Sequence, residues 1–163
     1  MFQRRQTKQI KIKNLGIGSD YPISIQSMTN TDTKDIDATV NQIKQLEENG
    51  CKLIRVAVVD IEAAQAIKEI KAQISIPLIA DIHFDYKLAL ESIKNGADGL
   101  RLNPGNIGKK ENIEKVVALA KEYKTPIRIG VNSGSLEKEF QQLSTANAMI
   151  QSALKHIKIL EEL

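Results

Sequence analysis

Three segments of this chain alternate apolar residues with an arginine, in the period-two pattern of a half-buried β-strand. They are residues 53–58 with Arg55, residues 99–103 with Arg101 and Asn103, and residues 127–132 with Arg128 and Asn132. Successive side chains of a strand point to opposite faces, so one face is shared by Ile54, Val56 and Val58 in the first segment, by Leu100 and Leu102 in the second, and by Ile127, Ile129 and Val131 in the third. The arginines lie on the other face. The three strands are therefore expected to share one design, with an apolar face and a cationic face.

Arginine is concentrated in these strands. The chain contains 23 lysines and arginines, yet beyond Arg5 its arginines are Arg55, Arg101 and Arg128 alone. The planar guanidinium group suits bidentate contacts with phosphate or carboxylate, and an unpaired buried charge costs several kcal/mol. One alternative is that each arginine pairs with a carboxylate of the protein or reaches water at a strand end. Because all three share one phase, we favour a common anion-binding site.

The composition is that of an ordinary globular domain. With 163 residues, 42% of them apolar and 26% charged, the chain is long enough for one domain with a core. The net charge of +3 comes without a basic run beside aromatic residues, so nucleic-acid binding is not expected. Residues 1–14 are polar and basic, and no window reaches the length of a membrane span. These features predict a cytoplasmic protein without membrane contact.

The single cysteine, Cys51, limits the metal chemistry that this chain can support. One cysteine excludes an internal disulfide and cannot by itself hold an iron–sulfur cluster or a structural zinc. Cys51 follows Asn49 and Gly50, which end a predicted helix, so we expect it to be a small buried residue at a turn. The sequence contains no cluster of histidine, cysteine and carboxylate with metal-ligand spacing, and no metal site is predicted.

The chain divides at about residue 20. Residues 1–20 are predicted to form a β-hairpin, because residues 8–13 alternate charge with isoleucine and residues 15–18 supply turn glycines. Residues 21–163 alternate strand and helix patterns. Strands are expected at residues 22–28, 53–58, 77–81, 99–103 and 126–131. Helices are expected from the cap Asp35 to Gly50, at about 61–72, through Leu90 and Ile93 as far as Asn95, at about 112–123, and across Met149 to Leu160.

The spacing of the five strands, about one strand–helix unit each, favours parallel pairing with helical crossovers. A doubly wound sheet and a barrel both satisfy this spacing. These strands carry polar residues near their carboxyl ends, where barrel enzymes have their active sites, rather than the continuous apolar runs of doubly covered strands. A complete barrel has eight strands in about 250 residues. The predicted fold class is therefore α/β, an incomplete TIM-type barrel of the first five β/α units, preceded by the hairpin.

Polar side chains are predicted to form a ring at the carboxyl ends of these strands. Its members are Gln26, Ser27, Asn30, Arg55, Asp81, His83, Arg101, Asn103, Arg128 and Asn132. Arginines and amides donate to phosphate oxygens, and histidine moves protons near neutral pH. We assign His83 and Asp81 as candidate catalytic residues, with Asp81 either orienting His83 or pairing with an arginine. The alternative is that Asp81 and His83 interact in a loop and have no catalytic role.

Two glycine-containing segments, residues 105–108 and 134–135, are further candidates for phosphate contacts through their backbone amides. Neither segment matches a dinucleotide fingerprint or a P-loop, so nucleotide binding is not predicted. Taken alone, these segments add little to the arginines.

Five blocks of the sequence together resemble one enzyme family. The blocks are residues 26–33 (QSMTNTDT), 55–58 (RVAV), 77–85 (PLIADIHFD), 101–108 (RLNPGNIG) and 128–136 (RIGVNSGSL). In this order, and across nearly the whole chain, they are similar to the 4-hydroxy-3-methylbut-2-en-1-yl diphosphate synthases of the non-mevalonate isoprenoid pathway.

The resemblance implies an amino-terminal TIM-type barrel whose mouth binds 2-C-methyl-D-erythritol 2,4-cyclodiphosphate. Enzymes of this family open that ring by a two-electron reduction to 4-hydroxy-3-methylbut-2-enyl diphosphate, with electrons from ferredoxin or flavodoxin passing through a [4Fe-4S] cluster. By their places in the matching blocks, six residues would grip the diphosphate: Arg55, His83, Arg101, Asn103, Arg128 and Asn132. The anion site inferred from the strands and the site implied by the resemblance coincide.

The resemblance also implies parts that this sequence does not match. In the family, three cysteines and a glutamate of a carboxyl-terminal domain hold the cluster, which meets the partner's barrel in a homodimer. That domain and the last three barrel strands are expected to be absent from this sequence, and Cys51 matches no cluster ligand. The favoured interpretation is that this chain is the amino-terminal part of the reductase and has no activity by itself. The alternatives are a catalytically inactive phosphate-binding or assembly module, and another anion-binding barrel such as a pterin-binding transferase.

Overall fold

The computed structural model describes residues 5–103, 107–108 and 110–163. Near its amino-terminal end, β1 (Ile10–Ile12) and β2 (Leu15–Ile17) pair in antiparallel fashion. Lys13, in the turn between them, has a φ of 55°, and a positive φ at the first central residue is typical of two-residue hairpin turns. The predicted hairpin is therefore confirmed.

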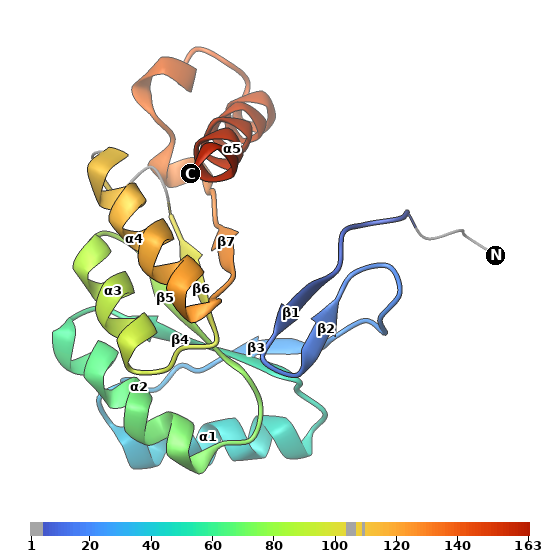
Figure 1. Cartoon of the computed structure of the whole chain (residues 1–163), viewed down its shortest axis with the longest axis vertical. Coiled ribbons are helices and arrows are strands. Elements are labelled where there is room, and N and C mark those ends of the chain that lie inside the picture. The colour runs from blue at the N-terminus through green and yellow to red at the C-terminus, as the bar shows by residue number, and fades with distance from the viewer. Residues whose placement is uncertain (1–4, 104–106, 109) are drawn as a thin grey trace.

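Five parallel strands form the main sheet (Figure 1). They are β3 (Gln26–Met28), β4 (Leu53–Val58), β5 (Leu78–Ile82), β6 (Gly99–Leu102) and β7 (Ile127–Ile129). Each strand pairs with the next one along the chain, in the order β3-β4-β5-β6-β7. A doubly wound sheet reverses its strand order at a switch point, whereas a barrel adds strands in one direction. The observed order therefore confirms the predicted barrel-type α/β fold.

A helix follows each strand of this sheet. The helices are α1 (Ile36–Glu48), α2 (Ile61–Gln73), α3 (Tyr86–Lys94), α4 (Lys110–Tyr123) and α5 (Thr145–Glu162). Helices α1 to α4 lie side by side on one face of the sheet (Figure 1). Asp35 caps α1 as predicted, because its Oδ1 accepts a hydrogen bond from the Ala38 amide at 3.0 Å. None of the described helices combines the length and the apolar composition that crossing a bilayer requires.

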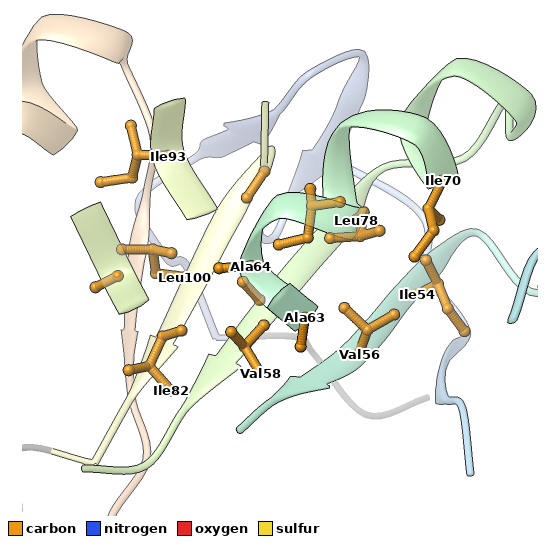
Figure 2. Close-up of a cluster of buried hydrophobic side chains, with 14 of the residues drawn as sticks. Ile54, Val56, Val58, Ala63, Ala64, Ile70, Leu78, Ile82, Ile93 and Leu100 are labelled. Carbon is orange, nitrogen blue, oxygen red and sulfur yellow. The ribbon is translucent and has the colours of Figure 1, made fainter. Parts of the chain in front are cut away.

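The main core lies between the sheet and these helices (Figure 2). Strand β4 sends Ile54, Val56 and Val58 to this side, and α2 meets them with Ala63 and Ala64, which have no exposed surface. Small alanine side chains let the helix approach the sheet closely. Burying one large aliphatic side chain contributes about 1.5–3 kcal/mol to stability. The apolar face predicted from the alternation is therefore the face that the helices cover.

The opposite face of the sheet, the inner face, is closed by the hairpin at the amino-terminal end of the strands. Leu53 of β4 and Ile79 of β5 pack there against Ile12 of β1 in a separate buried cluster. The hairpin lies on the side of the sheet away from α1 to α4 (Figure 1). The inner face is thus apolar at this end, and its polar residues lie nearer the carboxyl ends of the strands.

The first strand of the sheet is much shorter than predicted. We expected a buried strand over residues 22–28, but β3 has three residues, Ile23 is 84% exposed and Ile25 is also exposed. The cause is that β3 has only β4 as a neighbour. Their hydrogen bonding extends back from β3 by one bond, from the Lys52 amide to the Ile25 carbonyl at 2.8 Å. The residues before Ile25 therefore have no strand partner in the sheet and project from its edge.

The segment after β7 also differs from the prediction. The strand ends at Ile129 rather than at residue 131, and two short 3-10 helices follow, η2 (Ser133–Ser135) and η3 (Lys138–Phe140). Asn132 caps η2, since its Oδ1 accepts a hydrogen bond from the Gly134 amide at 3.0 Å. Such local side-chain bonds to the backbone compete with continued strand pairing.

Candidate anion-binding site

The register of the sheet brings the predicted polar residues into one row on the inner face. Asp81 of β5 is paired with Arg101 of β6, which is paired with Arg128 of β7. Neighbouring strands lie about 4.8 Å apart, so these three side chains are adjacent. Arg55 begins two residues lower on β4, because Asp81 is opposite Ala57. Its long side chain still reaches the carboxylate of Asp81.

Asp81 is the centre of this group. Its side chain is only 3% exposed, and its Oδ1 lies 3.0 Å from Nη1 of Arg101 and 3.3 Å from Nε2 of His83. Its Oδ2 lies 3.4 Å from Nε of Arg55. A buried carboxylate is stable only with such partners. Of the two roles expected for Asp81, contact with His83 and pairing with an arginine, both occur.

Arg101 is the most enclosed of the three arginines, with 12% of its side chain exposed. Its Nη1 donates to Asp81, and its Nη2 donates to the carbonyl oxygen of Gly130 at 2.9 Å. A guanidinium group has five N–H donors. Within the described part of the chain, these hydrogen bonds of Arg101 use two of the five donors, one on each terminal nitrogen.

Arg128 is joined to the opposite edge of the sheet. Its Nη1 donates to Oε1 of Gln26 at 2.7 Å, and β3 and β7 are the two edge strands. Arg128 is an exposed residue, but partial desolvation lowers its pKa below the usual value, and the charges of Arg55 and Arg101 lower that pKa further, against the effect of Asp81. The Arg128 guanidinium is therefore held where positive charge is already in excess.

The charge balance of this row favours an anion. Arg55 and Arg101 share the single carboxylate of Asp81, and within residues 5–103, 107–108 and 110–163 no salt bridge involves Arg128. Of the alternative raised by the sequence, pairing with a protein carboxylate accounts for Arg55 and Arg101 through one aspartate, and the exposed side chain of Arg128 reaches water. An excess of positive charge at a half-buried surface is relieved when a phosphate or carboxylate binds.

His83 lies at the rim of the row, directly after β5. Its side chain is 46% exposed, and its ring makes an edge contact with Phe84 at a centroid distance of 6.0 Å. One ring nitrogen contacts Asp81 while much of the ring faces solvent. This geometry suits a group that donates to an anion or exchanges a proton with a ligand above the row.

The two asparagines of the predicted ring lie in different surroundings. Asn103 directly follows β6 and is buried. Its backbone N–H donates to the carbonyl of Ile82 at 3.3 Å. Asn132 is exposed and uses its Oδ1 to hold the Gly134 amide. The Gly134 amide, a candidate phosphate donor from the sequence, is therefore already engaged in the turn. Of the other candidate segment, residues 105–108, the first two lie outside the described residues.

Of the remaining members of the predicted ring, Asn30 and Ser27 have other surroundings than the arginine row, and Gln26 contacts it. Asn30 pairs with Gln42 of α1, whose Nε2 donates to Oδ1 of Asn30 at 2.6 Å and whose Oε1 accepts from the Asn30 amide at 3.0 Å. Ser27 lies on β3 opposite Ile54, on the helix-covered face. Gln26 alone of the three contacts an arginine of the row.

Two contributors were not identified from the sequence. Met28 of β3 places its Sδ 3.2 Å from Nε of Arg55, and Gly130 accepts the hydrogen bond of Arg101. Gly130 falls in the same phase as Arg128 on its strand, which is the signal that places it on the inner face. Its contact with Arg101 is set by the neighbouring strand and has no sequence signal.

The residues of this chain do not fit an iron–sulfur cluster. Such clusters are held mainly by several cysteine thiolates, and Cys51 is the one cysteine of the sequence. It is buried, as predicted, and its Sγ donates to the carbonyl of Leu53 at 3.1 Å. No group of three or more potential metal ligands occurs among the described residues. No step involving a cluster is therefore assigned to this chain.

The sequence matches a known family over most of its length. A family model described as the GcpE TIM-barrel domain matches residues 7–163. The 4-hydroxy-3-methylbut-2-en-1-yl diphosphate synthase (flavodoxin) of Caldanaerobacter subterraneus subsp. tengcongensis is 61% identical, over 98% of this chain and 46% of the relative. The protein of the same name from Clostridium perfringens is 57% identical, over 99% of this chain and 47% of the relative. The chain thus spans about half the length of the curated relatives it matches.

Solved structures share the fold at much lower identity. The 7,8-dihydropteroate synthase from Vibrio fischeri ES114 aligns with a TM-score of 0.63 at 16% identity, over 96% of this chain and 62% of that chain. At such identity the likeness concerns the fold alone. It supports the barrel-type sheet and gives no support to the pterin-binding alternative.

Proposed function

This chain belongs to the GcpE TIM-barrel domain family, and on that premise we propose that it forms the diphosphate-binding mouth of a 4-hydroxy-3-methylbut-2-en-1-yl diphosphate synthase. The observation that carries the proposal is that Arg55, Arg101 and Arg128 lie on one face, where Asp81 is shared by the first two. The positive charges on this face therefore exceed the negative charge. The substrate proposed for this mouth is 2-C-methyl-D-erythritol 2,4-cyclodiphosphate, whose diphosphate supplies the missing negative charge.

The three arginines would bind the diphosphate oxygens directly. Arg101 and Arg55 are oriented by Asp81, and Arg128 is oriented by Gln26 on the far edge of the sheet. Fixed donors of this kind bind an anion without first losing side-chain freedom. Asn103 and Asn132, which follow the same strands, would contribute amide donors at the rim.

His83 and Asp81 would serve as the proton-handling pair. Nε2 of His83 lies 3.3 Å from Oδ1 of Asp81, which fixes the ring orientation, while 46% of the side chain is exposed to solvent. In this arrangement Nδ1 of His83 can donate to a phosphate oxygen or hold a proton beside it. Asp81 keeps the ring in place and is itself occupied by the two arginines.

The reduction itself would depend on groups that this chain does not supply. In the proposed reaction the ring opens by a two-electron reduction, with electrons from flavodoxin, which the relatives' names specify, or from ferredoxin. The [4Fe-4S] cluster that the family resemblance implies would supply electron transfer when bound. The resemblance places the cluster ligands in a separate carboxyl-terminal domain, and a homodimer would bring that domain to the mouth.

Calorimetric titration with the cyclodiphosphate tests the proposal. We expect one site per chain for the unaltered protein, and a much weaker site when Arg55, Arg101 or Arg128 is replaced by alanine. Weaker binding at higher salt is expected for an arginine-lined site. Absence of cyclodiphosphate binding by the unaltered protein at low salt would contradict the proposal.

A second candidate is a phosphate-binding or assembly module without redox chemistry. The observation that favours it is the lack of cluster ligands among the described residues and the single cysteine of the sequence. The two functions separate in an assay with reduced flavodoxin or ferredoxin on the protein that carries this chain. Binding of the cyclodiphosphate with no formation of 4-hydroxy-3-methylbut-2-enyl diphosphate would favour the module.

A further inference from the structure

Gly130 lies directly beneath the guanidinium group of Arg101. A Cβ atom on Gly130 would be 1.8 Å from Nε, 2.4 Å from Cζ and 2.6 Å from Nη2 of Arg101. Each distance is far shorter than the 3.5–4.0 Å at which uncharged heavy atoms normally meet. The guanidinium therefore occupies the space that any other residue at position 130 would fill with its side chain.

The need for glycine at this position is spatial and not conformational. Among the glycines that the structure describes, those with positive φ are Gly18, Gly50, Gly96 and Gly108, and Gly130 is not one of them. The Gly130 backbone is also fixed on both sides. Its amide donates to the Leu102 carbonyl at 2.8 Å, and its carbonyl accepts from Nη2 of Arg101 at 2.9 Å.

We propose that Gly130 is a positioning residue for Arg101 in the anion site. Its bare Cα seats the guanidinium plane, its carbonyl oxygen holds Nη2, and Asp81 holds Nη1 from the other strand. The plane and the direction of the remaining N–H groups are thereby set before a ligand arrives. The inference rests on the proposed function, because it explains how one proposed diphosphate ligand is held.

The direct test is Gly130→Ala. The added methyl group displaces the guanidinium, so Arg101 cannot keep its bonds to Asp81 and to residue 130 together. We expect binding of inorganic pyrophosphate and of the cyclodiphosphate to weaken at least about tenfold, the usual effect of losing one charged hydrogen bond. Affinity within about twofold of the unaltered protein would overturn the proposal.

A matched control is Gly99→Ala, on the same inner face and two residues before Arg101. The nearest atom to its added methyl is Cγ1 of Ile79 at 3.4 Å, an ordinary contact. This variant should bind both ligands as the unaltered protein does. If it loses affinity as much as Gly130→Ala, the loss follows from any added methyl on this face and the proposal fails.

A double variant separates positioning from a purely structural role. In an Arg101→Ala background the space above Gly130 is empty, so Gly130→Ala should reduce affinity by no more than about twofold further. Additive losses would overturn the proposal, since Gly130 would then act without Arg101. Should Gly130→Ala fail to fold, recovery of folding in the double variant supports the collision, and failure of both proteins to fold overturns it.

The same titrations distinguish the two levels of inference. If the unaltered protein binds neither ligand, the proposed function fails and the positioning role fails with it. If the unaltered protein binds and Gly130→Ala binds equally well, the mouth is retained and only the role of Gly130 is lost.

Discussion

The two ends of the inner face are built from the same strands and bury opposite kinds of side chain. At the amino-terminal end, Leu53 and Ile79 pack against Ile12 of the hairpin. Two residues further along β5, Asp81 is buried on the same face among arginines. The difference teaches that strand alternation fixes which side chains share a face, while the cover decides what that face can bury. The apolar cover contributes to stability, whereas the charged end has the excess of positive charge that the proposed anion binding requires.

The largest effect is expected from removing the shared carboxylate at the charged end. Asp81→Ala leaves Arg55 and Arg101 without their partner, and breaking a buried pair costs about 3–5 kcal/mol. Urea unfolding measures the change, with Asp37→Ala on the exposed start of α1 as the control. Equal stability of the two variants would contradict the central role of Asp81.

The apolar end is expected to respond differently. Ile79→Ala opens a cavity beneath the hairpin and should lower the free energy of unfolding by about 2–4 kcal/mol. Its affinity for the cyclodiphosphate should not change. The control is Ile23→Ala, which removes an exposed side chain and should alter stability by less than about 0.5 kcal/mol. A parallel loss of affinity in Ile79→Ala would break the distinction between the two ends.

The reverse pattern is expected for the arginine row. Arg101→Ala should weaken binding of the cyclodiphosphate by about 1.5–3 kcal/mol, the usual contribution of a charged hydrogen bond. Arg5→Ala, a charge-matched change at an exposed position, should leave the affinity within a few tenths of a kcal/mol at moderate salt. Calorimetry on the three proteins gives the comparison. Unchanged affinity would remove Arg101 from the site.

A fourth prediction concerns apolar surface outside the inner face. Ile150, Leu154 and Ile157 lie exposed along α5 at helical spacing, and β3 and β7 are open edge strands. Such surfaces promote self-association, so we expect the 163-residue chain to form oligomers or aggregates. Light scattering after size-exclusion chromatography should show less association for Ile150→Lys with Leu154→Lys. A monodisperse, cooperatively unfolding monomer would contradict this expectation.

The smallest effect is expected from pH, at the segment that follows β7. Burial raises the pKa of Glu137, but hydrogen bonds from Ser152, its own backbone and His156 bring that pKa below its usual value of 4.5. Nε2 of His156 on α5 lies 2.6 Å from Oε1 of Glu137. A depressed carboxyl pKa stabilises the fold above pH 4.5, and this contribution is lost as pH falls through the lowered pKa.

The matched variant for this pH effect is Glu137→Gln. It should lose about 1 kcal/mol at pH 7, the typical net contribution of one hydrogen bond, because the pair is largely enclosed. Its stability should also depend less on pH below 4.5 than that of the unaltered protein. Thermal unfolding from acidic to neutral pH provides the measurement, and identical pH profiles for both proteins would remove Glu137 from this role.

Elements governed by local contacts were predictable. The cap Asp35, the strand β4 and the buried Cys51 all follow from neighbours in the sequence, and the structure agrees. The length of β3 was not predictable in this way. A strand extends only where a neighbouring strand offers partners, and the start of β4 sets that limit.

The candidate site shows the same division. Arg55, Arg101 and Arg128 were placed on one face by alternation alone, and Asp81 was expected near them. The bond from Arg128 to Gln26 joins residues 102 positions apart, and no local pattern encodes it. The packing of the Arg101 guanidinium group against Gly130 is likewise a contact between segments that are distant in the sequence.

By itself, the sequence determined the strand–helix alternation and the face on which each arginine lies, because period-two and helical patterns are local properties. The resemblance to one family also came from the sequence, through five ordered blocks of residues. Only the tertiary structure decided that one carboxylate serves two arginines, that Arg128 is held from the opposite sheet edge and that Gly130 makes room for Arg101. These outcomes depend on strand register and on distances across the sheet. Register is set by the packing of the whole domain, and charge balance follows from it.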